Sequence, residues 1–197
     1  MMLCFKTNRL YRVFDIGQVD PDPYYAVGTS SQESIIETKA GVFFHHSSGI
    51  YQYNIYGVVQ EVSRPVIDFI KAIPTSFYGS VAGWLDVQGD HICWQIGTVT
   101  VRGTTYTNCV LRYTISTQTW THYSYPTQQT MSIRRQPFYT DGTTLFAICG
   151  DNSGNILEMD TGTQDINSSG TATPIPYSLI HRWDLLDGLF STRKTIQ

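Results

Sequence analysis

The carboxylates are the first residues in this chain that could do chemistry, because a suitably spaced pair hydrolyses glycosidic bonds. Five aspartates are available, but each lies beside a glycine or in a turn signature: Asp86, Asp90, Asp141, Asp151 and Asp160. Only four glutamates occur in the chain, and it contains no Gly-x-Ser-x-Gly elbow, Walker loop or dinucleotide fingerprint. We therefore expect no catalytic residues, no cofactor and no enzymatic activity. A glycoside-processing enzyme is one of three hypotheses for the function of the chain, and it would require carboxylates clustered around a channel.

Metal-ligating patterns are equally sparse. His45 and His46 are adjacent, so on a strand they point to opposite faces, and we expect both to lie at a solvated hairpin end. Residues 150–155 have the composition of a calcium loop, but Asp151 is their only carboxylate, which favours a tight turn. The four cysteines have no CxxC spacing, and three lie in apolar runs, which indicates buried free thiols: Cys93, Cys109 and Cys149. We expect no metal site.

Aromatic residues offer a binding surface instead of a catalytic one. Most of the thirteen tyrosines and four tryptophans fall at alternating strand positions, where cross-strand pairing is the ordinary explanation. Tyr123 and Tyr125 flank a turn at Pro126 that looks exposed, and Trp120 lies just before them. We predict that these three residues, Trp120, Tyr123 and Tyr125, form the binding surface.

The elements that position these residues are short strands that recur along the chain. Four segments share a polar third residue flanked by apolar ones, as a strand with period 2 requires: 10–14, 50–54, 110–114 and 156–160. Their starts are 40, 60 and 46 residues apart, which brackets the blade of about 40 to 50 residues in a β-propeller. The recurrence predicts equivalent positions in a repeated sheet.

Each repeat has further strands around that segment. Glycine-cornered hairpins precede the copies at Ile50 and Ile156, and a longer linker over 98–107 explains the 60-residue interval. A short helix is expected after Pro65, over 64–71, and a surface loop over 161–174. The pattern predicts one all-β domain over 1–197, a complete or partial propeller of three to four blades of antiparallel strands. The approximate blade units are 1–25, 26–75, 76–130 and 131–197. Because so few blades leave an open sheet edge, we expect a piece of a longer polypeptide or an oligomer.

The low fraction of charged residues, the small net charge and the short apolar runs limit the classes of function that we expect for this chain. Charged residues make up 15% of the chain, against roughly a quarter in an average soluble domain, and this suits a chain packed against other subunits. The net charge of −3 gives no global field to attract nucleic acid. No apolar run reaches the roughly 18 residues of a membrane helix, and the first residues lack a signal-peptide pattern.

Two family resemblances follow from these motifs. Residues 109–126 resemble the closing half of a kelch repeat, with Tyr113 and Trp120 at its spacing, although the Gly-Gly doublet is absent. Residues 6–11 resemble a strand opening of tailed-phage propellers. Residues 41–53, followed by Ser63-Arg64-Pro65, are similar to their blade signature, and 183–195 look like their closing strand pair. This family includes packaged-DNA stabilisation and head–tail closure proteins.

The phage resemblance implies a non-enzymatic virion component, a propeller module of the head–tail junction or tail. It implies partners such as portal or tail proteins, a homo-oligomer or larger assembly, and assembly in the host cytoplasm. The alternative is a propeller module that binds a carbohydrate or a host receptor.

Overall fold

The computed structural model describes residues 2–15, 18–19, 25–86 and 90–124, and beyond these the backbone of short strands alone. Side chains are described for 2–13, 25–86, 90–124 and Ile156. The chain divides into two units, Met1–Asp160 and Thr161–Gln197. Antiparallel strands make up most of the described secondary structure, which confirms the predicted all-β class.

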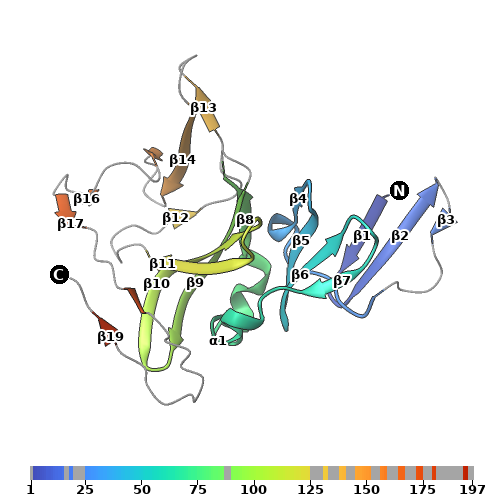
Figure 1. Ribbon diagram of the computed structural model, residues 1–197, viewed down its shortest axis with the longest axis horizontal. Helices are drawn as coiled ribbons and strands as arrows, with labels where there is room; N and C mark the ends of the chain where they lie inside the picture. Colours follow the sequence, from blue (N-terminus) through green and yellow to red (C-terminus); the bar gives the residue numbers. More distant parts are fainter. Residues whose placement is uncertain are drawn as a thin grey trace. The chain divides into compact units, whose positions relative to one another are not determined.

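The first unit contains four sheets of antiparallel strands (Figure 1). The first sheet comprises β1 (Met2–Lys6), β2 (Arg9–Asp15) and β3 (Gln18–Val19). The second comprises β4 (Ile36–Thr38), β5 (Gly41–His46), β6 (Gly49–Asn54) and β7 (Val59–Glu61). The third comprises β8 (Ala82–Leu85), β9 (His91–Val101), β10 (Thr104–Thr114) and β11 (Thr119–Ser124). The fourth comprises β12 (Met131–Ser132), β13 (Phe138–Thr140), β14 (Leu145–Asp151) and β15 (Ile156–Glu158).

In the second unit, two short strand pairs are described. The strands are β16 (Gln164–Ile166) with β17 (Ala172–Pro174), and β18 (Leu179–Ile180) with β19 (Arg193–Lys194). The loop expected over 161–174 is therefore wrong where β16 and β17 pair. Ile166 and Thr173, both β-branched, favour the extended backbone there.

The four recurring segments each form the second strand of a hairpin. They lie in β2, β6, β10 and β15, although residues 159 and 160 fall outside the described part. Each pairs antiparallel with the strand just before it in the chain, namely β1, β5, β9 and β14. The hairpins predicted before Ile50 and Ile156 are therefore confirmed, and the equivalence of the four segments as parts of blades stays a prediction.

Gly41 shows why a glycine begins the second hairpin. Its φ is +125°, a conformation that side chains disfavour, and an added Cβ would lie 2.2 Å from the Tyr53 carbonyl oxygen. Only a residue without a Cβ allows β5 to approach β6 this closely.

The third hairpin corrects the expected linker over 98–107. These residues continue β9 and β10, and the two strands turn at Arg102 and Gly103, which have φ values of 51° and 80°. A register shift between Tyr106 and Val110, with Asn108 at φ 46°, absorbs the irregularity as a β-bulge. The alternation of exposed threonines with buried Val99 and Val101 is a strand pattern.

The 60-residue interval between the segments that start at Ile50 and Val110 has a second cause, which is the helical connection between the second and third sheets. The 3-10 helix η2 (Arg64–Val66), with Pro65 in its first turn, leads into α1 (Ile67–Lys71), which confirms the helix expected there. A further 3-10 helix, η3 (Thr75–Ser80), precedes β8, while η1 (Gln32–Ser34) precedes β4. In the described residues, no helix is long and apolar enough to cross a membrane.

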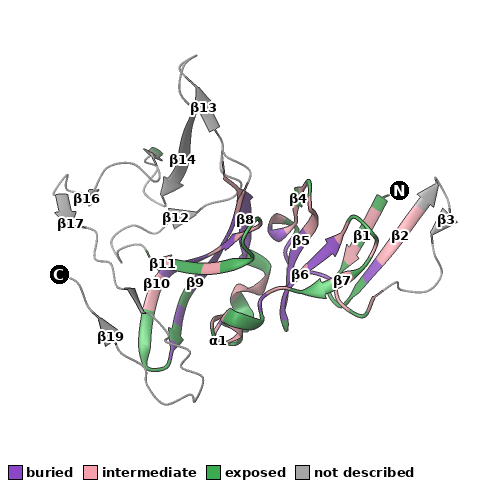
Figure 2. Cartoon of the chain, viewed as in Figure 1, coloured by how far each residue is buried: buried purple, intermediate pink, exposed green. Residues whose placement is uncertain are grey.

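The second sheet is packed on both of its faces. On one face, Phe44 and Tyr53 cluster with Leu10 of the first sheet, and the Phe44 and Phe5 ring centroids are 4.9 Å apart. On the other face, Phe43 and Ile50 join the core of the third sheet. Neighbouring residues on β5 thus serve opposite cores, as alternation requires. Figure 2 shows the resulting buried stretches in β6 and β8.

Candidate functional site

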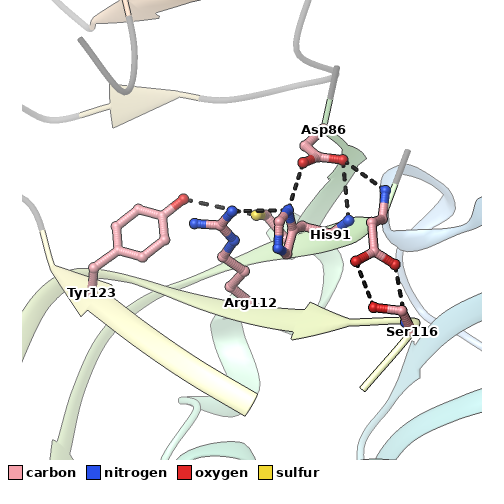
Figure 3. A network of polar contacts seen from close by, with 7 residues as sticks. Asp86, His91, Arg112, Ser116 and Tyr123 are labelled. Carbon is pink, nitrogen blue, oxygen red and sulfur yellow. Dashed lines mark hydrogen bonds and ion pairs between the residues drawn. The ribbon is translucent and has the colours of Figure 1, made fainter. Parts of the chain in front are cut away.

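A polar network lies on the face of the third sheet that is turned away from the second sheet (Figure 3). Asp86 directly follows β8, His91 begins β9, and Arg112 lies on β10. The register pairs Cys93 with Arg112, and paired residues share a face. Trp94, one residue from Cys93, belongs to the core on the opposite face. The sheet therefore has a core-facing side, which we call the apolar face, and a side that carries this network, which we call the polar face and on which Trp84 and Val110 are also buried.

Asp86 is the acceptor at the centre of this network. Its Oδ1 accepts the backbone N–H groups of Asp90 and His91, each at 3.0 Å, and its Oδ2 lies 2.6 Å from His91 Nδ1. Burial acts to raise the pKa of Asp86, but the hydrogen bonds and charge of His91 and the Asp90 N–H outweigh burial and lower that pKa. The carboxylate is therefore ionised at neutral pH and holds the turn between β8 and β9.

His91 Nδ1 has two competing neighbours. Besides Asp86 Oδ2, the Arg112 Nη2 group lies 2.8 Å from this nitrogen. A protonated Nδ1 donates to Asp86, whereas only a deprotonated Nδ1 accepts from Arg112, so one contact is satisfied at a time. The 2.6 Å distance to a carboxylate favours the first arrangement. The His91 side chain is 20% exposed, so solvent reaches this group.

The neighbouring turn is closed by Asp90. Its carboxylate accepts the Ser116 backbone N–H at 2.9 Å and the Ser116 hydroxyl at 2.7 Å, while its carbonyl accepts the Ile115 N–H. The Ser116 hydroxyl is thus bound to Asp90 in the observed arrangement. An Asp–His pair is a general acid–base arrangement, and the Ser116 hydroxyl donates to Asp90 and not to this pair. The geometry fits a binding or positioning role for the network.

Two of the three predicted binding residues, Trp120 and Tyr123, lie on opposite faces of the third sheet. Trp120 packs on the apolar face, with its ring 4.9 Å from Tyr113 and its Nε1 donating to the Val62 carbonyl at 2.9 Å. Tyr123 belongs to the polar face, where its hydroxyl lies 3.8 Å from Cys93 Sγ. Tyr125 lies outside the described residues. A shared surface of Trp120 and Tyr123 is therefore interrupted by β11 itself, and their role in binding stays a prediction.

For His45 and His46 the structure confirms one expectation and corrects another. His45 and His46 do face opposite ways, but the solvated position expected for both is wrong for His45, which is 0% exposed because β5 continues through it. Neither ring nitrogen of His45 has a hydrogen-bond partner, and burial, with a smaller contribution from His46, lowers its pKa from 6.5 to about 4. His46 lies at the surface, with Nδ1 2.7 Å from the Ser48 hydroxyl.

The remaining sequence candidates are placed as follows. Asp86 and Asp90 are engaged as above, the backbone of Asp151 ends β14, and Asp141, Asp160 and the loop 152–155 lie outside the described residues. Cys93 and Cys109 are buried, as expected, and neither forms a disulfide within the described residues; burial raises the pKa of Cys109 to about 12. The side chain of Cys149 is not among those described. Within the described part of the chain, no three His, Cys, Asp or Glu side chains gather to hold a metal ion.

His91 and Arg112 were missed from the sequence. The available signal was a turn, Asp86 to His91, in which an aspartate precedes a strand beginning with histidine. Arg112 is 21 residues further along and joins them only through the register of β9 and β10. No protein-family model matches this chain, and a search of curated protein sequences gave no match.

Proposed function

We propose that the chain is a non-enzymatic structural component of a tailed-phage virion, a propeller module of the head–tail junction or tail that binds neighbouring subunits. The observation that carries the proposal is the packing of the second sheet, a four-stranded meander covered on each face by another antiparallel sheet. Successive meanders stacked in this way are the building pattern of a propeller. The virion is then its place of action, after assembly in the host cytoplasm.

The contact between first strands also supports a propeller. In both the second and third sheets the first strand is short, and these strands, β4 and β8, contact each other. The contact continues beyond these strands, because the Phe43 ring of β5 lies 5.8 Å from the Tyr113 ring of β10 and Trp120 of β11 donates to the Val62 carbonyl. Sheets packed face to face from their first strand to their last are arranged as neighbouring blades are.

Two of the motifs that carry the phage resemblance, Gly-Ile-Tyr and Ser-Arg-Pro, are in direct contact. The Ser63 hydroxyl accepts the Ile50 backbone N–H at 2.9 Å, and Val62 N–H donates to the Ile50 carbonyl. A Cβ on Gly49 would lie only 2.9 Å from Ser63 Oγ, so a glycine suits this position. Arg64 then begins η2, with Pro65 in its first turn. The Gly-Ile-Tyr and Ser-Arg-Pro motifs therefore act together, which explains why the resemblance pairs them.

An incomplete first sheet fits a subunit of a larger assembly. This sheet has three strands, and among the described residues the outer edge of β1 has no strand beside it. A free edge invites a further strand from elsewhere in the polypeptide or from a neighbour. The alternative, a glycan-binding propeller, has less support because the indole of Trp120 is engaged with Tyr113 and Val62.

Quantitative mass spectrometry of particles assembled from the genome that encodes the chain tests the proposal. The expected result is the chain at a fixed copy number per portal ring, retained through density-gradient purification. A major capsid protein provides the internal reference. Particles that form and purify without the chain would contradict the proposed function.

A further inference from the structure

The turn between β6 and β7 presents three large apolar side chains to solvent. Tyr56 is 85% exposed, Ile55 is 68% exposed and Val58 is 48% exposed. We call residues 55–58 the apolar tip. Single exposed apolar residues are ordinary on soluble proteins, but a contiguous group marks an interaction site.

The apolar tip is held in one conformation by its own hydrogen bonds. Asn54 Oδ1 accepts the N–H groups of both Tyr56 and Val58 at 3.0 Å. The backbone of Asn54 donates to the Val58 carbonyl and accepts from the Gly57 N–H, and Gly57 has φ +82°. The Tyr25 hydroxyl donates to the Gly57 carbonyl from outside the turn. Because the turn is fixed before any contact forms, docking costs little ordering entropy.

Charge and size select the class of partner. Residues 50–60 contain no Asp, Glu, Lys, Arg or His, so the apolar tip has no electrostatic match to nucleic acid or to an acidic membrane. Its complement is an uncharged apolar pocket. Three side chains also fall well short of the roughly 800 Å² per partner that a stable pairwise interface buries. The contact therefore suits one anchor within a larger interface, repeated over the copies of an assembly.

We propose that the apolar tip inserts into an uncharged apolar pocket on a neighbouring protein subunit of the assembly, with Tyr56 as the anchor. Aromatic side chains seated in a desolvated pocket dominate interface energies, and Tyr56 is the most exposed of the three. This inference rests on the proposed function and deepens it by naming the surface through which the module binds.

The test compares incorporation of tagged variants into particles assembled from the genome that encodes the chain. Tyr56→Ser and Ile55→Ser remove apolar contact while leaving Asn54 and Gly57 to form the turn. Ile156→Ser is the matched control, because Ile156 is 77% exposed on β15, outside the apolar tip and away from the free edge of β1. Circular dichroism and thermal midpoints should agree for all four proteins, since these side chains are at the surface.

The expected result is normal incorporation of the wild type and Ile156→Ser, with Tyr56→Ser reduced roughly tenfold or more. Equal incorporation of Tyr56→Ser and the wild type would overturn the inference while leaving the proposed function intact. Absence of the wild type from particles would overturn the proposed function and, with it, this docking site.

Two further measurements exclude other occupants. In sedimentation velocity of the isolated chain, concentration-dependent association lost in Tyr56→Ser would assign the apolar tip to a second copy and overturn the inference. Co-flotation with phosphatidylcholine vesicles, lost in the same variant, would assign it to a neutral bilayer and do the same. No tip-dependent signal is expected in either measurement.

Discussion

Acidification should destabilise the chain through His45, whose imidazole is fully buried with no partner at either nitrogen. Tyr78 of η3 faces the ring, at 5.7 Å between centroids, and the backbone N–H of His45 donates to the Ser34 hydroxyl. His46, on the same strand, adds a like charge when protonated. None of these neighbours offers a negative charge, so the imidazolium form has no compensation in the folded state.

The size and sign of the effect follow from linkage. The pKa of His45 is about 4 in the folded chain and 6.5 in its ordinary state. The unfolded chain therefore binds a proton first as the pH falls, which favours unfolding. The penalty is absent well above pH 6.5, grows between pH 6.5 and about 4, and is complete below that. The difference between the two pKa values amounts to about 3 kcal/mol.

Urea unfolding at several pH values between 7 and 4 measures this effect in the wild type and in His45→Leu. Leucine fills a similar volume without ring nitrogens, and the N–H that bonds to Ser34 is unchanged. We expect the wild type to lose about 1 kcal/mol per pH unit more than His45→Leu, with the steepest difference near pH 5, midway between the two pKa values. His46→Gln, at the surface, should retain most of the wild-type slope. Parallel losses in the wild type and His45→Leu would refute the reasoning.

Three further substitutions test the packing of the sheets by chemical denaturation. Ser63→Ala leaves the buried Ile50 N–H without its acceptor and should lower the free energy of unfolding by about 1–3 kcal/mol. An unchanged free energy would contradict a stabilising role for the hydrogen bond between Ile50 and Ser63. Gly41→Ala should destabilise far more than Gly103→Ala, because both have positive φ but only Gly41 has a backbone oxygen where the Cβ would go; equal losses would contradict the close approach of β5 and β6. Trp120→Phe keeps the ring stack and loses the hydrogen bond to Val62, so we expect a loss of about 1 kcal/mol and would read an unchanged stability as evidence against that bond.

Local patterns predicted the strands because period-2 alternation and glycine-cornered turns are properties of adjacent residues. The hairpin of β5 and β6 could be predicted in this way from residues 41–53. The burial of His45 could not, because it depends on one more residue of strand before the turn and on the η3 segment that covers it. Strand ends are the least certain feature of any local pattern.

The polar network of the candidate site could not be predicted from local sequence patterns, for a related reason. Asp86 and His91 meet through a turn that is visible in the sequence, but Arg112 reaches them only after β9 and β10 adopt one register, bulge included. Likewise, the direction of Trp120 depends on which face of the third sheet meets the second. The register of two strands and the face on which a sheet packs are fixed by tertiary packing, and no single segment of the sequence determines them.

Cryo-electron microscopy of the chain within an assembled particle tests the central claim most directly, namely that these stacked sheets are propeller blades of an assembly subunit. The account predicts that the hairpins β1–β2, β5–β6, β9–β10 and β14–β15 radiate from one axis, with β4 and β8 lining it. It also predicts a further strand along the free edge of β1. A map in which the sheets share no axis and β1 borders solvent would contradict the account.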